Sequence, residues 1–462
     1  MDFKERFLVH RGIIIIILLF IAANALFLNF YKDVWWDSSV YIGMGKYIFS
    51  SGSSGLWEES RPLLFPFLLG IGWKMGFDTV IFGRVISLAF AGLALFMIYL
   101  IGSRLFSRKI GLMAAFFLGF SFTFFFFSSN ILTEIPSIFF MLLAFYFFIG
   151  NRFFLMGLFS GLAVITRFFQ VFMVSGMILA FLFYFFNKKG FCKKLFYFAM
   201  GFSIPVIPLI FLNYHLYGDI LTPIKVQMHL SRTTGLANYH EYWFYFAGLL
   251  KENFLLVFFI AIPFFFRKDY RFYALLLAPI IHLAVFSVVR QKEMRYALLA
   301  VPFLCLLLAY CLWQIYEKTK NKQIAVEIFS VMVVLFLLTG FISLKDSLSY
   351  QQQLNDEGLR HFQDYIRDAK GKIWITNPIY ALYSESKIDG LLYYKSGPNL
   401  IKFLRENEAD TVLFNNCDME CPPLGLDKEC IESRQELTRK LLKMELIYDE
   451  KVNSCRYQVF TS

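Results

Sequence analysis

Charged residues are scarce in this chain. Asp, Glu, Lys and Arg together make up 17% of its 462 residues, whereas hydrophobic residues make up 58% and aromatic residues 20%. A water-soluble protein of this length could not cover so much apolar surface, because close to half of an average globular chain is polar. The composition therefore excludes an ordinary soluble protein and predicts a chain embedded in a membrane.

Two further signals are missing. No small-x-small cleavage site follows the basic residues 1–11, so segment 12–31 is expected to remain as a first membrane span rather than a removed signal peptide. The formal net charge of +11 could suggest nucleic acid, but Lys and Arg lie mostly in short hydrophilic breaks between apolar runs. That distribution is typical of loops at a membrane face and argues against nucleic-acid binding.

Long apolar runs recur between Gly12 and Gly340. Runs of about 17–22 residues can cross a hydrocarbon core ~30 Å thick as helices. We therefore expect a polytopic α-helical membrane protein with about eleven transmembrane helices, in the plasma membrane. The predicted spans are residues 12–31, 80–103, 112–128, 131–149, 153–168, 169–187, 195–213, 252–266, 271–289, 296–315 and 324–344.

The basic residues predict the orientation of these spans. Cytoplasmic loops are enriched in Lys and Arg, and eleven spans with a cytoplasmic N-terminus place the C-terminal part of the chain outside the cytoplasm. The short segments that this topology places inside carry 17 basic residues, namely Lys4, Arg6, Arg11, Arg104, Arg108, Lys109, Arg152, Lys188, Lys189, Lys193, Lys194, Arg267, Lys268, Arg271, Lys318, Lys320 and Lys322.

Two loops on the predicted outer side are long. The first, residues 32–79, contains an apolar stretch at 62–77 that is short for a span and is expected to form helices along the membrane interface. The second, residues 214–251, is rich in Tyr, Trp and His, a composition that suits the level of the lipid headgroups. Both loops are assigned to a membrane domain that covers residues 1–344.

Residues 345–462 have a different composition and are expected to form a small extracytoplasmic domain. Short β-like runs alternate with helical segments, which predicts an α/β layer. The expected helices are residues 345–371, 398–408 and 432–443, and the expected strands are 372–377, 411–415, 445–448 and 456–461.

Four of the seven cysteines lie in this domain: Cys417, Cys421, Cys430 and Cys455. An extracytoplasmic location favours disulfides, which would stabilise a domain of this size. A zinc site is the alternative, but the four residues lack the paired close spacing that such sites usually show. Free thiols are a third option, and the sequence does not determine the pairing.

Some charged residues depart from the inward bias. They lie on the predicted outer side, and several occur at or inside the ends of spans, where a cation is costly unless it has an anionic partner or faces a wet cavity. A ring of cations and carboxylates would suit a lipid phosphate, because Arg and Lys hold phosphate and a carboxylate can accept a proton from an attacking hydroxyl. Headgroup anchoring and internal ion pairs are the alternatives. The residues are Arg61, Lys74, Arg84, Arg167, Arg290, Lys292, Arg295, Asp37, Glu58, Glu59, Glu134 and Glu293.

Five motifs resemble those of one family, the GT-C glycosyltransferases, and within it the protein O-mannosyltransferase and aminoarabinose-transferase-like group. None is specific alone, but they occur in the family's order between residues 35 and 302 and precede a C-terminal outer domain. The motifs are WWDSSVY at residues 35–41, RPLLFP at 61–66, TEIP at 133–136, NYHLYGD at 213–219, and KEMRY at 292–296, which runs into Val301-Pro302.

The resemblance implies transfer of a hexosyl or pentosyl group from a polyprenyl-phosphate-linked donor to a protein, lipid or glycan acceptor at the outer membrane face, with inversion. Asp37 would be the general base, since a carboxylate in a partly desolvated cavity can deprotonate an acceptor hydroxyl. A solvated loop carboxylate is the alternative for Asp37. Many relatives carry Glu after this Asp, whereas this chain has Ser38, which puts any paired-carboxylate arrangement in doubt.

Further site residues follow from the same motifs. Lys292 and Arg295 are the candidates for holding the donor phosphate, and they would share one helical face if the tenth span begins early; snorkelling at the membrane surface is their alternative. Glu134 precedes Pro136, which predicts a helix N-terminus, and would orient the acceptor or the sugar unless it is only a helix-start charge. The remaining candidates are Arg61 and Arg167 for the phosphate, and Tyr41, Tyr296 and Arg290 for the substrate.

Cofactors and other functions stay open at this point. Asp37, Glu134 and the loop residues His215, His229 and His240 could ligate a divalent cation, but no spacing announces a metal site, and each loop histidine is better explained as structural. A non-enzymatic lipid-linked sugar flippase or transporter is the main alternative; such proteins usually show internal repeats and midplane charges, which we do not find here. A structural subunit that kept the fold and lost the site ranks last.

Overall fold

The structure is a computed structural model of the whole chain. It describes residues 3–28, 34–233, 240–289, 291–353, 362, 364–367, 369–392, 398–419, 428–452 and 454–462. Contacts divide the chain into two compact units. The helical unit is Met1–Lys32, Arg84–Ile220 and His240–Gln353, and the sheet unit is Asp33–Gly83, Leu221–Tyr239 and Leu354–Ser462.

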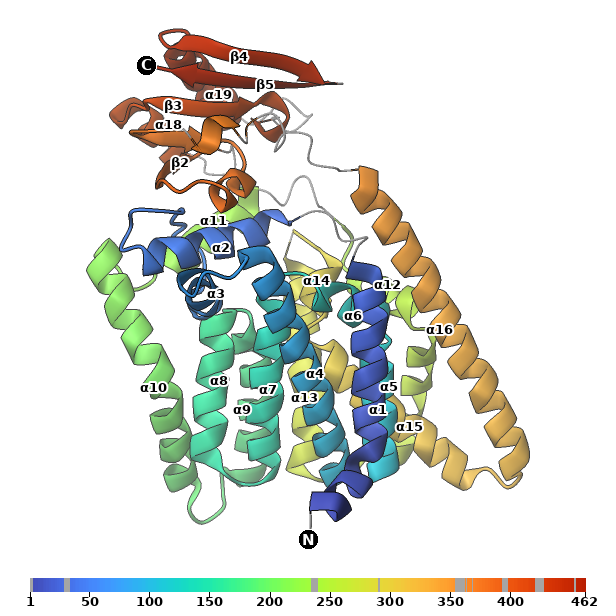
Figure 1. The fold of residues 1–462 in the computed structure, drawn as a ribbon. Helices are drawn as coiled ribbons and strands as arrows, with labels where there is room; N and C mark the ends of the chain where they lie inside the picture. Colours follow the sequence, from blue (N-terminus) through green and yellow to red (C-terminus); the bar gives the residue numbers. More distant parts are fainter. Residues whose placement is uncertain are drawn as a thin grey trace. The chain divides into compact units, whose positions relative to one another are not determined.

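Long apolar helices make up the helical unit (Figure 1). Within the described residues, five helices are long and apolar enough to cross a bilayer, or seven segments if each of two bent pairs is one span. The helices of this unit and those that enter it are α1 (Phe3–Phe27), α4 (Thr79–Leu105), α5 (Arg108–Gly119), α6 (Phe122–Ser128), α7 (Glu134–Ile149), α8 (Phe153–Thr166), α9 (Gln170–Phe185), α10 (Phe191–Tyr217), α12 (Phe244–Glu252), η3 (Phe254–Phe265), α13 (Tyr270–Val288), α14 (Met294–Ala297), α15 (Val301–Lys318) and α16 (Lys322–Gln353).

The predicted fold class is confirmed: the chain is a polytopic helical membrane protein with a small α/β domain. Each of the eleven predicted spans overlaps one of these helices or a bent pair. The number of helices that cross the membrane, and which end faces outward, stay predictions. Most of the apolar surface of α10 and α16 is exposed. Only 6% of the most apolar 18-residue stretch of α10 and 11% of that of α16 is buried, as expected for helices that face lipid.

Glycines bring the helices of this unit into close contact. A Cβ atom added to Gly157 in α8 would lie 2.0 Å from the Phe198 carbonyl oxygen in α10, and one added to Gly201 in α10 would lie 2.0 Å from the Phe154 carbonyl oxygen. Small residues at such crossings let two backbones approach and gain dispersion contacts that lipid cannot replace. These two glycines let α8 pack closely against α10, and Gly176 of α9 lies close to Ala278 of α13 in the same way; α8 also packs against α7.

Two bent helix pairs are joined to each other at their breaks. α5 and α6 meet at an angle of 65°, and α12 and η3 meet at 107°. The Thr123 hydroxyl in α6 donates a hydrogen bond to the Glu252 carboxylate at the end of α12. Asn253 at the second break accepts a hydrogen bond from the Leu255 amide, which satisfies a backbone group that the bend releases.

Among its described residues, the sheet unit contains five strands in the order β2-β1-β3-β5-β4. β1 pairs in parallel with β2 and β3, whereas β5 pairs antiparallel with β3 and β4. The strands are β1 (Ile373–Ile375), β2 (Ile388–Leu391), β3 (Thr411–Asn415), β4 (Glu445–Val452) and β5 (Cys455–Thr461), and the helices of the unit are α2 (Trp36–Phe49), α3 (Leu64–Lys74), η4 (Pro378–Leu382), α11 (Thr222–Thr233), α18 (Pro398–Glu406) and α19 (Lys428–Leu441).

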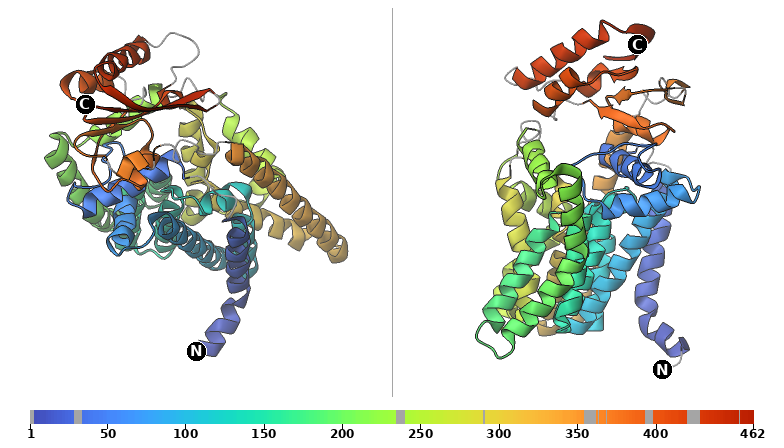
Figure 2. Two further views of the ribbon diagram at one scale, coloured as in Figure 1. Left: turned by 45° about the horizontal axis from the view of Figure 1, so that its top comes forward. Right: turned by 90° about the vertical axis from the view of Figure 1, so that its left-hand side faces the viewer.

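A row of large apolar side chains on one sheet face explains where α18 and α19 pack. Trp374, Val412 and Phe460 lie side by side in the register of β1, β3 and β5. With residues of α18 and α19, among them Leu404 and Leu437, they form one buried cluster. The two helices lie together on that one face of the sheet (Figure 2). The expected α/β layer is present. The sequence analysis did not predict β2, because this strand has only four residues and one of them is a glycine.

The sheet unit also tests the cysteine prediction. Cys417 and Cys455 form a disulfide that joins the end of β3 to the start of β5. Cys430 is disulfide-bonded as well, and Cys421 lies outside the described residues. The expectation that disulfides outrank zinc is confirmed for the described cysteines of this domain.

Residues 33–83, which the sequence assigns to the membrane domain, make their contacts in the sheet unit. The 62–77 stretch contains α3, as expected for a short helix, and the preceding segment forms α2, which begins within the WWDSSVY motif. Gly45 and Gly70 allow α2 and α3 to touch: a Cβ on Gly45 would lie 2.8 Å from the Gly70 nitrogen.

Candidate active site

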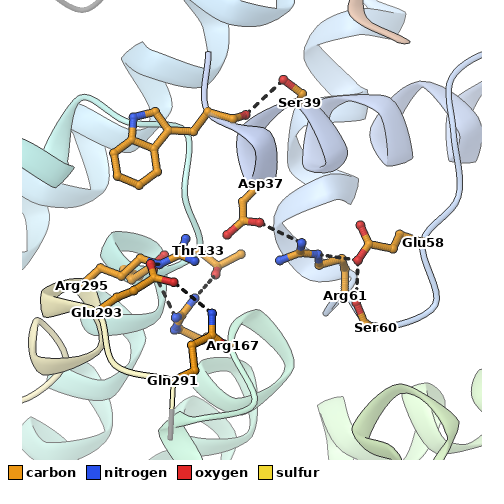
Figure 3. A network of polar contacts seen from close by, with 12 residues as sticks. Asp37, Ser39, Glu58, Ser60, Arg61, Thr133, Arg167, Gln291, Glu293 and Arg295 are labelled. Carbon is orange, nitrogen blue, oxygen red and sulfur yellow. Dashed lines mark hydrogen bonds and ion pairs between the residues drawn. The ribbon is translucent and has the colours of Figure 1, made fainter. Parts of the chain in front are cut away.

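Asp37 lies in the first turn of α2, where a carboxylate is favoured by the helix dipole. Its Oδ1 atom is 2.8 Å from Nη2 of Arg61, and the two side chains are 13% and 15% exposed. The Arg61 guanidinium also lies over the Tyr41 ring, with Cζ 5.6 Å from the ring centre. The three residues that two separate motifs single out therefore form one contact group, which we call the α2 cluster. Figure 3 shows the contact between Asp37 and Arg61.

The same arginine has a second acidic partner. Nε of Arg61 is 3.1 Å from Oε1 of Glu58, and the Ser60 hydroxyl donates to that oxygen at 2.7 Å. The Arg61 guanidinium thus bridges the carboxylates of Asp37 and Glu58, and these two contacts fix its position. Burial raises the pKa of the neighbouring Glu59. Glu58 belongs to the outer acidic residues of the sequence, but its role as a partner of Arg61 was not foreseen.

A second group, the helical cluster, lies where α7 begins and α8 ends. Nη2 of Arg167 is 3.1 Å from Oε1 of Glu134, and Nη1 of Arg167 donates to the Thr133 hydroxyl at 3.0 Å. The Glu134 side chain is fully buried and that of Arg167 is 9% exposed. A buried charge persists only when it is paired, so the two residues depend on each other. Glu134 starts α7, as Pro136 predicts.

Tyr296 joins this cluster to the KEMRY motif. Cζ of Arg167 lies 5.6 Å from the centre of the Tyr296 ring, and Cζ of Arg295 lies 5.4 Å from it. Two guanidinium groups near one aromatic ring form favourable cation–π contacts and concentrate positive charge. Arg295 is also held by Glu293, with Nε 2.6 Å from Oε2, and the Gln291 amide donates to the other oxygen of that carboxylate (Figure 3).

Lys292 differs from the expectation. α14 begins at Met294, so Lys292 precedes the helix, and the condition under which Lys292 and Arg295 would share a helical face does not hold. The Lys292 ammonium donates to the Val289 carbonyl at 2.8 Å and lies 5.7 Å from the centre of the Tyr242 ring. Burial lowers the pKa of Lys292, and nearby Glu241 opposes that shift. Arg290 lies outside the described residues.

His282 is a residue of this region that sequence reasoning missed. It lies in α13, is fully buried, and its Nε2 is 2.8 Å from the Tyr296 carbonyl oxygen. Its ring packs against Phe286, with ring centres 4.7 Å apart. The contact ties the short α14 turn to a membrane helix. A single buried histidine inside an apolar run carries little signal, because its partner is a backbone group fourteen residues away.

The loop histidines give no metal site in the part of the chain that the structure describes. Among those residues no group of three or more His, Cys, Asp or Glu side chains is placed to hold a metal ion. His240 instead stacks on Phe244, with ring centres 4.3 Å apart, while the side chain of His229 lies outside the described residues.

Comparison with solved structures identifies the fold class. ArnT from Cupriavidus metallidurans bound to undecaprenyl phosphate is 11% identical, with a TM-score of 0.65 over 96% of this chain and 97% of that one. The Archaeoglobus fulgidus oligosaccharyltransferase tethered to an acceptor peptide is 13% identical, with a TM-score of 0.62 over 99% and 74%. The arabinofuranosyltransferase AftD from Mycobacteria is 11% identical, with a TM-score of 0.52 over 98% and 41%. At these identities the likeness shows the fold alone, which is the GT-C membrane fold.

The sequence comparison is more specific. The model of the Alg9-like mannosyltransferase family matches residues 12–382, a range that includes both clusters. The chain therefore belongs to the Alg9-like mannosyltransferase family and is a GT-C glycosyltransferase of the membrane. None of the curated proteins compared with the chain matches it.

Proposed function

We propose that the protein transfers a sugar from a polyprenyl-phosphate-linked donor to a protein, lipid or glycan acceptor at the outer membrane face, and that Asp37 is the general base. The observation that carries the proposal is the Asp37–Arg61 ion pair at the start of α2, in a chain whose glycosyltransferase family model spans both residues. ArnT, which shares the fold, is bound to undecaprenyl phosphate in its structure.

The proposed reaction is one displacement. The acceptor oxygen forms a bond to the anomeric carbon while the bond from that carbon to the phosphate oxygen breaks, which inverts the configuration. The acceptor proton passes to the Asp37 carboxylate, and the bonding electrons leave with the polyprenyl phosphate. Arg61 keeps the carboxylate oriented, because Asp37 is contacted on a defined oxygen.

Cations would stabilise the leaving phosphate. We assign this role to Lys292 and Arg295, assisted by Arg61 and Arg167, because charge that develops on the phosphate is best stabilised by groups already in place. Arg295 and Arg167 are each held by a carboxylate, so neither needs to reorganise when the bond breaks. Lys292 is buried, so its ammonium is less strongly hydrated than that of a surface lysine.

The remaining candidates are assigned to binding. Glu134 would orient the acceptor or the sugar indirectly, through Arg167, since its own carboxylate is fully buried. Tyr41 and Tyr296 offer aromatic faces next to guanidinium groups, a pairing suited to stacking on a sugar ring. Arg290 is assigned to substrate binding on its place in the sequence.

Purified protein in lipid nanodiscs, incubated with a panel of synthetic polyprenyl-phosphate mannose, arabinose and aminoarabinose donors, tests the proposal. We expect release of polyprenyl phosphate from one donor when an extract of acceptors is added, with and without EDTA. Mass spectrometry of glycans from cells with and without the gene would then identify the product. Transbilayer movement of a donor without any release would contradict transfer and favour the transporter alternative.

The orientation is tested separately by cysteine labelling. Cys192 is exposed and lies in a segment predicted to be cytoplasmic, so a membrane-impermeant maleimide should not reach it in intact cells. Ser53→Cys in a Cys192→Ser background should react, because Ser53 is exposed and belongs to the predicted outer loop. Labelling of Cys192 from outside would reverse the topology and place the proposed site on the cytoplasmic side.

A further inference from the structure

One lysine of the sheet unit is buried, and its ammonium is held by backbone carbonyl groups. Lys46, in the last turn of α2, is 6% exposed. Its ammonium donates three hydrogen bonds, to the carbonyl oxygens of Ala381 at 3.2 Å, Leu382 at 2.6 Å and Ser384 at 3.1 Å. An ammonium has three donors, so its hydrogen-bonding capacity is filled by one short segment of the C-terminal domain. Burial lowers its pKa to about 8, against the opposing effect of Glu385.

The segment that receives Lys46 is itself fixed to the sheet. It is η4 and the residues just after it, and η4 follows β1 directly. The Asn377 side chain accepts a hydrogen bond from the Ile379 amide and thereby caps η4. Asp418 accepts from the Thr376 hydroxyl at 3.0 Å. The three carbonyls therefore belong to a part of the domain whose position is set by the parallel strands.

Two further contacts join α2 and its following loop to the same domain. A Cβ on Gly43 would lie 2.8 Å from Leu56 and 3.6 Å from the Ala381 side chain, so α2 lies close against η4. The Gly55 carbonyl accepts a hydrogen bond from the Ile388 amide at 2.8 Å, which adds residue 55 to the edge strand β2. Gly55 has φ of +80°, and a Cβ there would lie 2.2 Å from the Gly43 carbonyl oxygen, so only glycine fits.

The opposite end of α2 carries Asp37. Every residue from Ser38 to Lys46 is buried, so this helix is packed along its length. Asp37 and Lys46 are nine positions apart, or about 13 Å at 1.5 Å per residue. A helix of this length moves as a rigid rod, because bending it would break backbone hydrogen bonds that are shielded from water. Displacement at the Lys46 end is therefore transmitted to Asp37.

We propose that Lys46 is a positioning residue for the transfer reaction, through which the C-terminal domain holds α2 and with it the general base. This rests on the proposed function, because it assigns to the domain a part in orienting Asp37. It predicts that loosening the Lys46 contacts lowers the rate of the chemical step more than it weakens donor binding. The C-terminal domain would then be part of the catalytic apparatus and not only an acceptor-binding appendage.

The test uses the full-length protein in nanodiscs and two independent readouts. Hydrogen exchange of the Trp36–Phe49 peptide reports on α2 whether or not the protein is active. In Lys46→Met we expect exchange near residues 36–41 to rise by about 10-fold. With a donor on which the wild type is active, we expect kcat to fall by about 10-fold and the donor KM to change by less than about 2-fold. Lys46→Arg keeps a cation with N–H groups that can donate to the same carbonyls. It should therefore bring both the hydrogen exchange of α2 and kcat part of the way back to the wild-type values.

Two more variants guard the interpretation. Asn377→Ala acts from the other side of the contact by removing the cap of η4, and should give the same pattern with a smaller amplitude; it decides the question if Lys46→Met does not fold. Lys402→Met, on an exposed lysine of α18, should behave like the wild type. Unchanged exchange of α2 in Lys46→Met or Asn377→Ala overturns the proposal. If the wild-type protein transfers no sugar, the proposed function is overturned instead. The hydrogen-exchange result then still tests whether the Lys46 contacts hold α2 in place.

Discussion

The two polar clusters each pair a carboxylate with an arginine, but they differ in how deeply the pair is buried. In the helical cluster, the Glu134 carboxylate is fully buried and is paired with Arg167, at the end of a neighbouring helix. In the α2 cluster, Asp37 and Arg61 remain partly exposed, at 13% and 15%, and Glu58 shares the cation. The Glu134–Arg167 pair therefore mainly stabilises the fold, whereas the Asp37–Arg61 pair keeps a carboxylate accessible to a substrate. We assign the base to the second cluster for this reason.

The largest difference between the clusters should appear in stability. Arg167→Met leaves the Glu134 charge buried without its ion-pair partner, so we expect a loss of about 3–5 kcal/mol. Arg61→Met should cost about 1–3 kcal/mol, because water can reach Asp37. Reversible unfolding in mixed micelles measures both losses. The double variant Glu134→Gln, Arg167→Met should regain part of the loss, and equal losses for the two arginine variants would remove the distinction.

The next comparison is between two histidines of the helical unit. His282→Ala removes the partner of the buried Tyr296 carbonyl, and we expect a loss of about 1–3 kcal/mol together with weaker donor binding, because α14 carries Arg295. His10, whose Nδ1 is 3.2 Å from the Tyr99 hydroxyl, provides the control. His10→Ala should leave the donor KM unchanged. If both variants raise that KM alike, His282 has no special role in positioning the motif.

The smallest effect concerns the charge on Lys46. Its pKa is lowered from 10.5 to about 8 in the folded protein, so between these values the unfolded chain binds more protons and the folded state gains stability as the pH rises. The stability of the wild type relative to Lys46→Met should therefore increase by about 2 kcal/mol from pH 8 to pH 10. Unfolding of both proteins at each pH measures this difference. A flat or falling difference would mean that the ammonium is not buried.

Local patterns predicted most of the elements. The long apolar runs located the helices, Pro136 located the start of α7, and short β-like runs located β3 and β5. These features depend on neighbours within a few positions. The expected helix in residues 345–371 is confirmed for residues 345–353, which belong to α16, and for 362 and 364–367, whereas 369–371 are not helical; the rest of that range lies outside the described residues.

What the sequence could not predict depends on distant partners. β2 forms because Ile388 and Gly390 pair with residues of β1 that lie about fifteen positions earlier in the chain. The sequence of α2 contains two glycines, which helices normally avoid, so it did not predict a helix there. Lys46 reads as an ordinary surface lysine, since its acceptors lie more than 330 residues away. The same holds for His282, and for the short α14 that separates Lys292 from a helical face. The motifs supplied the candidate residues of the proposed site, but not the contacts that hold them in place.

The most direct test of the account is sugar transfer by Asp37→Asn. The amide keeps the size of the side chain but cannot accept the acceptor proton, so we expect transfer to fall by about 100-fold to 10,000-fold while donor binding and folding persist. Asp78→Asn, which changes an exposed carboxylate at the start of α4 and can still cap that helix, should transfer sugar at the wild-type rate. Wild-type transfer by purified Asp37→Asn would contradict the assignment of the base.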